Sequence, residues 1–369
     1  MNSSSHSSIS RPQFGQKDPN DPQTPLAALF IGRYPSEPTP RTMFYGVLKG
    51  EQQVREFLFG DYRTEYNNNK PIASVMMLGI DSSQKDRQKL LVDPFTFDQV
   101  WDGAFDLDDR ALTAYSNGSR GLHVISDTST RPVFFLGTHD YAIIWTYDIE
   151  SYSTKGIVIG SHDNDIVDYM SHSVNEHDNT LVFHPLYPAY YHVTVGFNKI
   201  PRFETHIKNA KRSIKAAQNH QSASRLLEEY TIAMKQTRDI IDRLGVIVGI
   251  FARLNGPING RVIMLRIAQR GDVEDDEEES QETKEAEQGL EMATKGLEQS
   301  LVKLEPQVLT IVIPYFVQEY KTHLQIEQAL KIKIRSLEQF AVAAKAGSIT
   351  MIIGILVVAY LLLTGVINW

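Results

Sequence analysis

No charged side chain interrupts Ala346-Gly-Ser-Ile-Thr-Met-Ile-Ile-Gly-Ile-Leu-Val-Val-Ala-Tyr-Leu-Leu-Leu-Thr-Gly-Val-Ile-Asn-Trp369. A helix through this stretch rises about 1.5 Å per residue, which is enough to cross a hydrocarbon core of about 30 Å. A buried helix of a soluble core needs a shorter apolar run and usually contains polar interruptions. We therefore expect residues 346–369 to form one transmembrane helix.

Basic residues precede this stretch, at Lys331, Lys333, Arg335 and Lys345, and none follows it. Because Lys and Arg accumulate on the cytosolic side of a span, the bias predicts that the amino-terminal part of the chain faces the cytosol. The sequence thus predicts a single-pass, tail-anchored membrane protein. It does not indicate which organelle holds it.

Composition excludes several function classes. The chain has no cysteine, so disulfides, thiolate metal sites and cysteine nucleophiles are ruled out. A formal net charge of −8 disfavours a nucleic-acid partner, because binding phosphates requires a basic surface. DNA and RNA are therefore not expected partners.

The first part of the chain changes character near residue 40. Residues 1–40 are rich in Ser and Pro, so we expect a mostly disordered arm whose apolar patch Leu26–Ile31 can dock on the body. Residues 41–200 predict an α+β cytosolic domain, with helices at Glu51–Leu58 and Phe95–Phe105. The expected strands are Ile72–Leu78, Gly121–Ile125, Val133–Leu136, Tyr141–Tyr147 and Lys155–Ile159. Short connectors between the later strands predict an antiparallel meander.

Residues 201–345 predict a helical bundle or stalk. One helix is expected from Ser224 to Arg253, and a later helix carries a leucine stripe that Pro306 and Pro314 end or kink. The acidic stretch at 272–287 is interpreted as a solvated linker, with a divalent-cation or basic-partner contact as the alternative. Apolar residues at three- and four-residue steps then lead towards the span. They indicate packing within the chain, or a homo-oligomer formed through a coiled coil.

Two similar tetrads, Gly137-Thr-His-Asp140 and Gly160-Ser-His-Asp163, each follow an apolar strand. Imidazole and carboxylate groups ligate metals and transfer protons, so His139, Asp140, His162 and Asp163 are the candidate metal ligands, for Mg²⁺ or another divalent cation. Adjacent strand residues point to opposite faces, and Gly, Ser, Thr and Asp are also typical of turns and helix caps. The turn-and-cap interpretation is therefore the main one, and no cofactor is assigned.

Motifs for nucleotide binding and for serine hydrolases are absent. The sequence contains no G-x-G-x-x-G after a strand, no G-x-x-x-x-G-K-[ST] and no G-x-S-x-G. These absences favour a role in protein interaction over an enzymatic one.

Two stretches that precede the helical region resemble fungal proteins called CorA-like. They are Ile144-Trp-Thr-Tyr-Asp-Ile-Glu-Ser-Tyr-Ser-Thr-Lys-Gly-Ile-Val-Ile159 and Phe183-His-Pro-Leu-Tyr-Pro-Ala189. That resemblance implies a cytosolic sensor-like domain on a helical stalk, in an oligomer. A CorA-type transporter ends its first membrane helix with Gly-Met-Asn and adds a second helix. Here the corresponding stretch reads Thr364-Gly-Val-Ile-Asn-Trp369.

Three hypotheses follow. The preferred one is a non-enzymatic interaction or scaffold protein anchored in a membrane. The first alternative is a degenerate or oligomeric CorA-like divalent-cation transporter. The second is a membrane-bound metal-dependent hydrolase that uses the two tetrads.

Overall fold

The computed structural model describes 13–14, 26–82, 89–92, 94–126, 131–160, 180–217, 223–255 and 281–363, except for positions 36, 38, 61–65 and 67–68. Within some helices, including α9 from residue 346 onward, only the backbone is described. The chain divides into two compact units. The first contains residues 1–198 and 243–312, and the second contains residues 199–242 and 313–369.

The first unit is an α+β domain built on a seven-stranded mixed sheet in the order β3-β2-β4-β9-β8-β7-β6. Its strands are β2 (Leu26–Arg33), β3 (Arg41–Leu48), β4 (Ala73–Asp81), β6 (Gly121–Ser126), β7 (Val133–Gly137), β8 (Tyr141–Asp148) and β9 (Ser153–Gly160). Only β4 and β9 pair in parallel, and the other neighbours are antiparallel. The five predicted strands are confirmed, and so is the antiparallel meander of the last three, β7 to β9. A separate two-stranded parallel pair joins β1 (Gln13–Phe14) to β5 (Lys89–Leu90).

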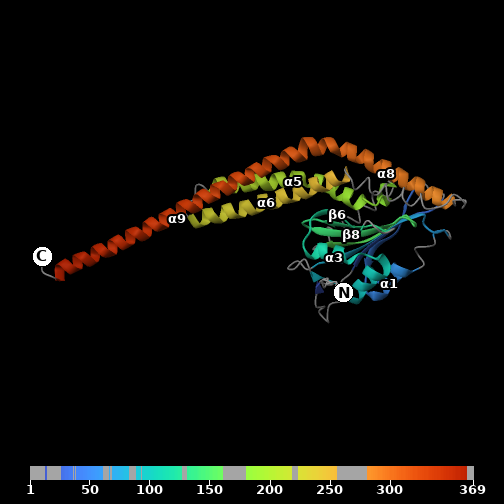
Figure 1. Cartoon of the computed structure of the whole chain (residues 1–369), viewed down its shortest axis with the longest axis horizontal. Coiled ribbons are helices and arrows are strands. Elements are labelled where there is room, and N and C mark those ends of the chain that lie inside the picture. The colour runs from blue at the N-terminus through green and yellow to red at the C-terminus, as the bar shows by residue number, and fades with distance from the viewer. Residues whose placement is uncertain are drawn as a thin grey trace, which may run out of the picture. The chain divides into compact units, whose positions relative to one another are not determined.

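The helices of the first unit cover both faces of the sheet. On one face lie α1 (Glu51–Phe59), α2 (Pro94–Asp98), the π-helix η2 (Gln99–Phe105) and α3 (Asp109–Ser116). Figure 1 shows α1 and α3 on the side of the sheet opposite α8. The core on that face includes Phe57, Trp101, Phe135 and Ile144, which are all fully buried. The predicted helices at 51–58 and 95–105 are confirmed, although most of the second one is π-helical.

The opposite face is covered by the short 3₁₀ helix η3 (Thr180–Phe183), the start of α5 (Tyr187–Ala217), the end of α6 (Ala223–Leu254) and α8 (Gln281–Gln307). The indole N–H of Trp145 donates to the carbonyl oxygen of Pro185 at 2.7 Å, which joins β8 to this layer. Every residue of β8 is buried, as expected for a strand covered on both faces.

Two expectations about chain organisation need correction. Leu26–Arg33 does not belong to an unstructured arm, because it forms β2, pairs with β3 and β4, and is almost wholly buried. Residues 243–312 belong to the same unit as the sheet, so the helical region 201–345 is not one separate domain. Within the expected acidic linker, residues 281–287 form the first turns of α8, and the remainder lies outside the described residues.

The second unit contains the end of α5, the first part of α6 and α9 (Ile313–Leu363). Its helices contact one another through polar groups. Lys211 lies 3.6 Å from Glu319, and the Thr237 hydroxyl lies 3.1 Å from Nδ1 of His323. The predicted helix from Ser224 to Arg253 corresponds to α6 within one residue at each end.

The two prolines do not end the helical stretch. Pro306 lies in the last turn of α8, the π-helix η4 (Val308–Val312) follows, and α9 starts immediately after it. Proline removes one backbone donor, and a local π-helix accommodates the disturbed hydrogen bonds. The Thr310 hydroxyl donates to the carbonyl oxygen of Pro306 at 2.6 Å.

Among the residues whose side chains are described, one helical stretch, Lys284–Lys333, is long and apolar enough by length and composition to cross a membrane. Only 12% of its most apolar window is buried. The predicted span at residues 346–369 is helical as far as Leu363, and its side chains lie outside the described residues.

Candidate functional site

The first tetrad forms the turn between β7 and β8. The Thr138 hydroxyl donates to the carbonyl oxygen of Tyr141 at 2.7 Å and accepts from the backbone N–H groups of Asp140 and Tyr141 at 3.2 and 3.0 Å. Short hydroxyl side chains stabilise turns in this way. Thr138 is therefore a structural residue of the hairpin.

The two candidate ligands of this tetrad lie in different environments. His139 is buried, at 7% exposure, whereas Asp140 is half-buried and accepts from Nη1 of Arg243 at 2.5 Å. Arg243 belongs to α6, so the ion pair fixes the turn to the helical layer. Among the described residues, no group of three His, Cys, Asp or Glu side chains is arranged to hold a metal ion.

The second tetrad begins where β9 ends, at Gly160, while His162 and Asp163 lie outside the described residues. The strand register nevertheless places Gly160 beside Tyr141 on one side and Asp81 on the other. The first residue of the second tetrad, Gly160, therefore lies next to Tyr141, the residue that follows the first tetrad. Sequence reasoning treated the two tetrads separately, because their register depends on the pairing of β8 with β9.

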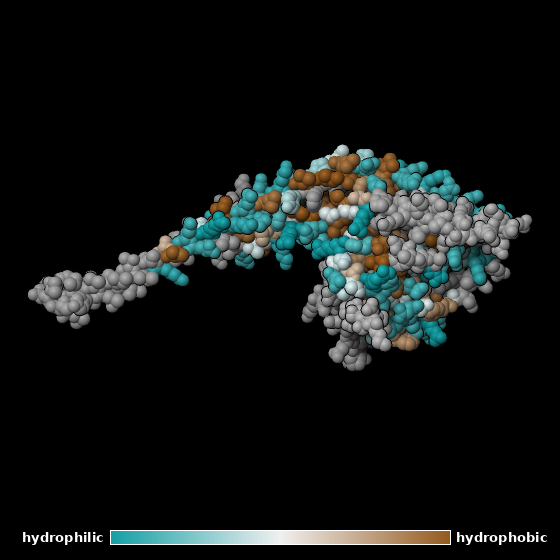
Figure 2. Space-filling model, in the orientation of Figure 1, coloured by the Kyte–Doolittle hydropathy of each residue, from teal (hydrophilic) through white to brown (hydrophobic). Residues whose placement is uncertain are grey.

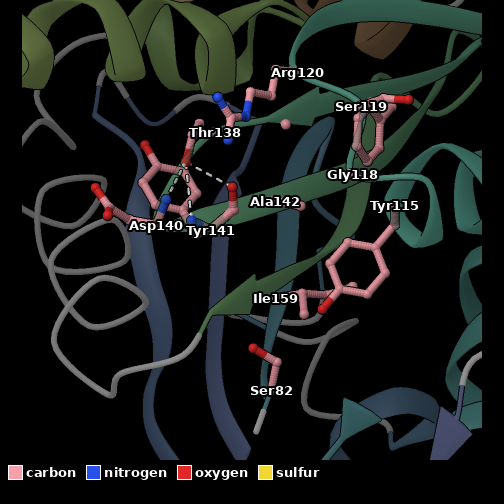
Figure 3. A pocket seen from close by; sticks show the side chains of 12 residues that line it. Ser82, Tyr115, Gly118, Ser119, Arg120, Thr138, Asp140, Tyr141, Ala142 and Ile159 are labelled. Carbon is pink, nitrogen blue, oxygen red and sulfur yellow. Dashed lines mark hydrogen bonds between the residues drawn. The ribbon is translucent and has the colours of Figure 1, made fainter. Parts of the chain in front are cut away.

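A pocket of about 220 Å³ opens beside Tyr141 (Figure 3). Its floor contains the buried side chains of Phe135, Ala142 and Ile159. Its rim includes Tyr115 and the exposed Arg120, together with Asp140 of the β7–β8 turn. In Figure 3 the Arg120 guanidinium lies towards Thr138, and the Tyr115 hydroxyl points towards Ile159.

The wall formed by α3 depends on its carboxyl-terminal cap. The N–H of Ser119 donates to the carbonyl of Ala114, and Gly118 has a φ of +64°. This is the geometry of a Schellman motif, in which glycine takes the left-handed position without strain. The cap turns the chain so that Ser119 and Arg120 lead into β6 beside the pocket.

Glycine is also required on the strand side of this wall. A Cβ on Gly137 would clash with the carbonyl oxygen of Ser119, so only glycine lets β7 approach the end of α3 this closely. Gly137 pairs with Gly121 across the β6–β7 ladder. The first glycine of the tetrad is thus explained by backbone packing.

Ser82, Tyr115 and Arg120 are pocket residues that sequence reasoning did not identify. The only local signal is the breaker cluster Asn117-Gly-Ser-Arg120, which marks a helix end before a predicted strand. The pocket itself forms from four separate segments, so no local pattern reveals it.

His184, another histidine near the tetrads in sequence, lies between η3 and α5, on the opposite face of the sheet. Its Nδ1 accepts from the N–H of Leu186 at 3.0 Å, and its side chain is 1% exposed. Burial lowers the pKa of His184 to about 3, because desolvation disfavours the charged imidazolium. A neutral imidazole with this hydrogen bond stabilises the turn that precedes α5.

His192 connects α5 to the pocket region. Its Nδ1 lies 2.6 Å from the hydroxyl of Tyr141, and the two rings make an edge contact with centroids 5.5 Å apart. Tyr141 also lines the pocket. The helical layer therefore supports the pocket wall through both His192 and Arg243.

No protein-family model matches the chain, and no curated protein is significantly similar to it.

Proposed function

We propose that this chain is a membrane-anchored interaction protein that presents its α+β domain on the cytosolic side. The observation that supports this most is the continuity of α9, which extends from residues packed against α5 and α6 into the charge-free stretch that starts at Ala346. A span in this stretch would therefore be joined to the second unit by one continuous helix. The basic residues Lys331, Lys333, Arg335 and Lys345 before that stretch support a cytosolic orientation.

Residues 346–369 are the better candidate for the span than Lys284–Lys333. The latter stretch contains Lys295, Glu298 and Lys303 and buries Leu290, Leu297 and Leu301 against protein. A charge at the centre of a bilayer costs about 2.5–3.5 kcal/mol even on insertion-based scales. The charge-free stretch has no such cost.

Cell fractionation of the full chain and of a chain ending at Lys345 tests the anchor. The full chain is expected in the alkaline-carbonate pellet, and the shortened chain in the supernatant. A shortened chain that stays in the pellet would place the anchor elsewhere, with Lys284–Lys333 as the next candidate. Protease added to intact vesicles is expected to digest the α+β domain, and full protection would refute the orientation.

The interaction role is supported by apolar side chains that α9 exposes. Val317, Tyr320 and Leu324 are 43%, 48% and 38% exposed and follow one another at three- and four-residue steps, so they share one helix face. Figure 2 shows apolar side chains interrupting the polar surface along α8 and α9. This spacing suits helix–helix packing, and anchoring in one membrane holds copies of the chain parallel. The partner we propose for this face is a second copy.

The mass of the detergent-solubilised chain tests this partner. We expect the wild type and the control Gln325→Glu, an exposed change on another face, to be oligomeric. Leu324→Glu is expected to be monomeric, because a charge on the contact face must be desolvated. A wild-type monomer, or an oligomer that Leu324→Glu leaves intact, would overturn the assignment.

A metal-dependent hydrolase is the second candidate, and one observation favours it. The register of β8 and β9 brings the starts of both tetrads to one sheet edge, beside the pocket. The hypothesis predicts stoichiometric divalent metal in the purified chain and its loss in a His139→Ala, His162→Ala double variant. Unchanged metal content in that variant would remove this candidate.

A further inference from the structure

The second unit is basic, although the chain as a whole is acidic. Residues 199–242 and 313–369 contain 14 Lys and Arg against 8 Asp and Glu, whereas the rest of the chain contains 23 against 37. A charge asymmetry between parts of one chain indicates a surface for an oppositely charged partner. An anionic partner is therefore expected at the second unit.

Helix α5 contributes six of these basic residues and a single acidic one, Glu204. Lys208, Lys211 and Arg212 follow one another within four residues, at spacings that place them on one helix face, and all three are exposed. The sequence adds Lys215 one turn further on. We call the surface formed by Lys208, Lys211 and Arg212 the α5 basic face.

The charges of the α5 basic face are only partly used within the fold. Lys211 pairs with Glu319 at 3.6 Å, whereas Lys208 and Arg212 form no ion pair with any residue that the structure describes. The helix macrodipole favours cations in the last turn only, so it does not account for Lys208, which lies nine residues before the end of α5. These two side chains are therefore open to an outside partner.

The form of the surface favours a polypeptide segment over a small anion. Small ligands occupy concave sites that bury most of their surface, whereas the α5 basic face is the exposed outer side of a helix. Every described polar side chain of α5 from Arg202 to Arg212 is exposed, over a length of roughly 15 Å. Such a surface fits a helix or an extended segment laid along it.

Two other anionic partners fit less well. Lys211 contacts Glu319, so the α5 basic face lies about 40 Å along α9 from Ala346, where the stretch that we propose to cross the bilayer begins. Charges are screened beyond about 10 Å at 0.1 M salt, so the headgroups of that bilayer are out of range. A nucleic acid carries charge along its whole length and is repelled by the acidic remainder of the chain.

We propose that the α5 basic face binds an acidic polypeptide segment of a partner protein. The Arg212 guanidinium holds one carboxylate through two parallel hydrogen bonds, and the Lys208 ammonium attracts a second carboxylate one turn away. Exposed ion pairs are screened by salt, so binding weakens as the salt concentration rises. This proposal goes beyond the anchor and the self-association of α9, and it requires neither.

The test uses the full chain in nanodiscs of neutral phosphatidylcholine and measures the fluorescence anisotropy of labelled probes. The acidic probe is a short peptide of Glu-Glu-Ala-Ala repeats, and its neutral control has Gln in place of Glu. A short DNA duplex represents nucleic acids. We expect saturable binding of the acidic peptide that weakens when salt is raised from about 50 to about 200 mM, and no saturable binding of the neutral peptide.

Two double variants with the same change in net charge assign the surface. Lys208→Glu with Arg212→Glu is expected to weaken binding of the acidic peptide roughly tenfold or more, because two attractive contacts become repulsive. The control, Lys333→Glu with Arg335→Glu, changes exposed residues about 20 Å along α9 from Glu319 and is expected to bind within about twofold of the wild type. All four residues are exposed and glutamate is a good helix former, so both variants are expected to fold.

The proposal is overturned if the acidic peptide does not bind saturably or if the neutral peptide binds equally well. An equal loss of binding in the two double variants also overturns it, because net charge alone would then attract the peptide. Tighter binding of the DNA duplex that Lys208→Glu with Arg212→Glu abolishes would assign the surface to nucleic acid instead.

Discussion

His184 makes the stability of the α+β domain depend on pH. Its pKa is 6.5 in the unfolded chain and about 3 in the folded one, because the side chain is wholly buried. Below pH 6.5 the unfolded state therefore binds more protons than the folded state. The stability is fully present above pH 6.5 and is lost as the pH falls towards the folded pKa.

The magnitude follows from this difference in pKa. Linkage gives a loss in the free energy of unfolding of about 1 kcal/mol at pH 5.5 and about 2 kcal/mol at pH 5.0, relative to pH 7.5. His184→Asn isolates the contribution, because the Asn side-chain oxygen can accept the Leu186 N–H that Nδ1 now accepts, yet it does not titrate. Loss of the imidazole ring lowers the free energy of unfolding at every pH, so the informative quantity is the change in this free energy with pH.

Urea unfolding of the solubilised chain at pH 7.5, 6.5, 5.5 and 5.0 measures this slope. Tryptophan fluorescence is a suitable signal, because Trp101 and Trp145 are buried and Trp145 bonds to Pro185, next to His184. The wild type should lose about 2 kcal/mol more than His184→Asn between pH 7.5 and 5.0. His206→Asn, which changes an exposed histidine, should keep the wild-type slope. Parallel slopes for the wild type and His184→Asn would refute the reasoning.

Three further predictions concern packing and charge. Gly156→Ala should destabilise the domain by about 1–3 kcal/mol in urea unfolding, because its Cβ would lie 2.5 Å from the carbonyl oxygen of Ile144. Gly249→Ala, in the open interior of α6, should be neutral or stabilising by up to about 1 kcal/mol, and equal effects would contradict this account. A double-mutant cycle with Asp140→Asn and Arg243→Gln should give a coupling of about 0.5–1 kcal/mol, whereas zero coupling would mean that the pair does not fix the turn. Lys211→Met should increase proteolysis of the second unit, because Lys211 is the ion-pair partner of Glu319, which is 4% exposed and whose Oε2 has no hydrogen-bond partner among the described residues. Adding Glu319→Gln should restore resistance to proteolysis, and if it does not, the buried carboxylate is not the cause.

Local patterns in the sequence predicted much of the fold. The strands from 121 to 159 are short apolar runs between breakers, and α6 has a clear helical period, so each could be located without knowing its neighbours. β2 could not be located in this way. Its apolar patch was recognised, but the proline-rich flanks resembled an unstructured arm, and its place in the sheet depends on pairing with β4, far along the chain.

The pocket could be predicted even less well from local sequence patterns, because it combines distant segments. Arg120, Asp140 and Ile159 come from a helix cap, a hairpin turn and the end of another strand. The sequence indicated that the two tetrads contain suitable chemistry, yet it gave no distance between them. The register of β8 with β9 places Gly160, the first residue of the second tetrad, beside Tyr141. The structure also shows that Thr138 stabilises the turn and that Gly137 allows the close approach of α3.

The way α9 is packed bears on how the proposed anchor would operate. Its buried positions Glu319, Thr322, Ile326 and Leu330 recur at three- and four-residue steps, so one face contacts protein up to Leu330. Beyond that point, every side chain that the structure describes between residues 331 and 345 is exposed. At 1.5 Å per residue this segment is roughly 20 Å long. If residues 346–369 cross the bilayer as we propose, the segment from 331 to 345, whose described side chains are exposed and include four basic groups, separates the packed part of α9 from the lipid surface. Partners can then reach Val317, Tyr320 and Leu324 without steric hindrance from the membrane.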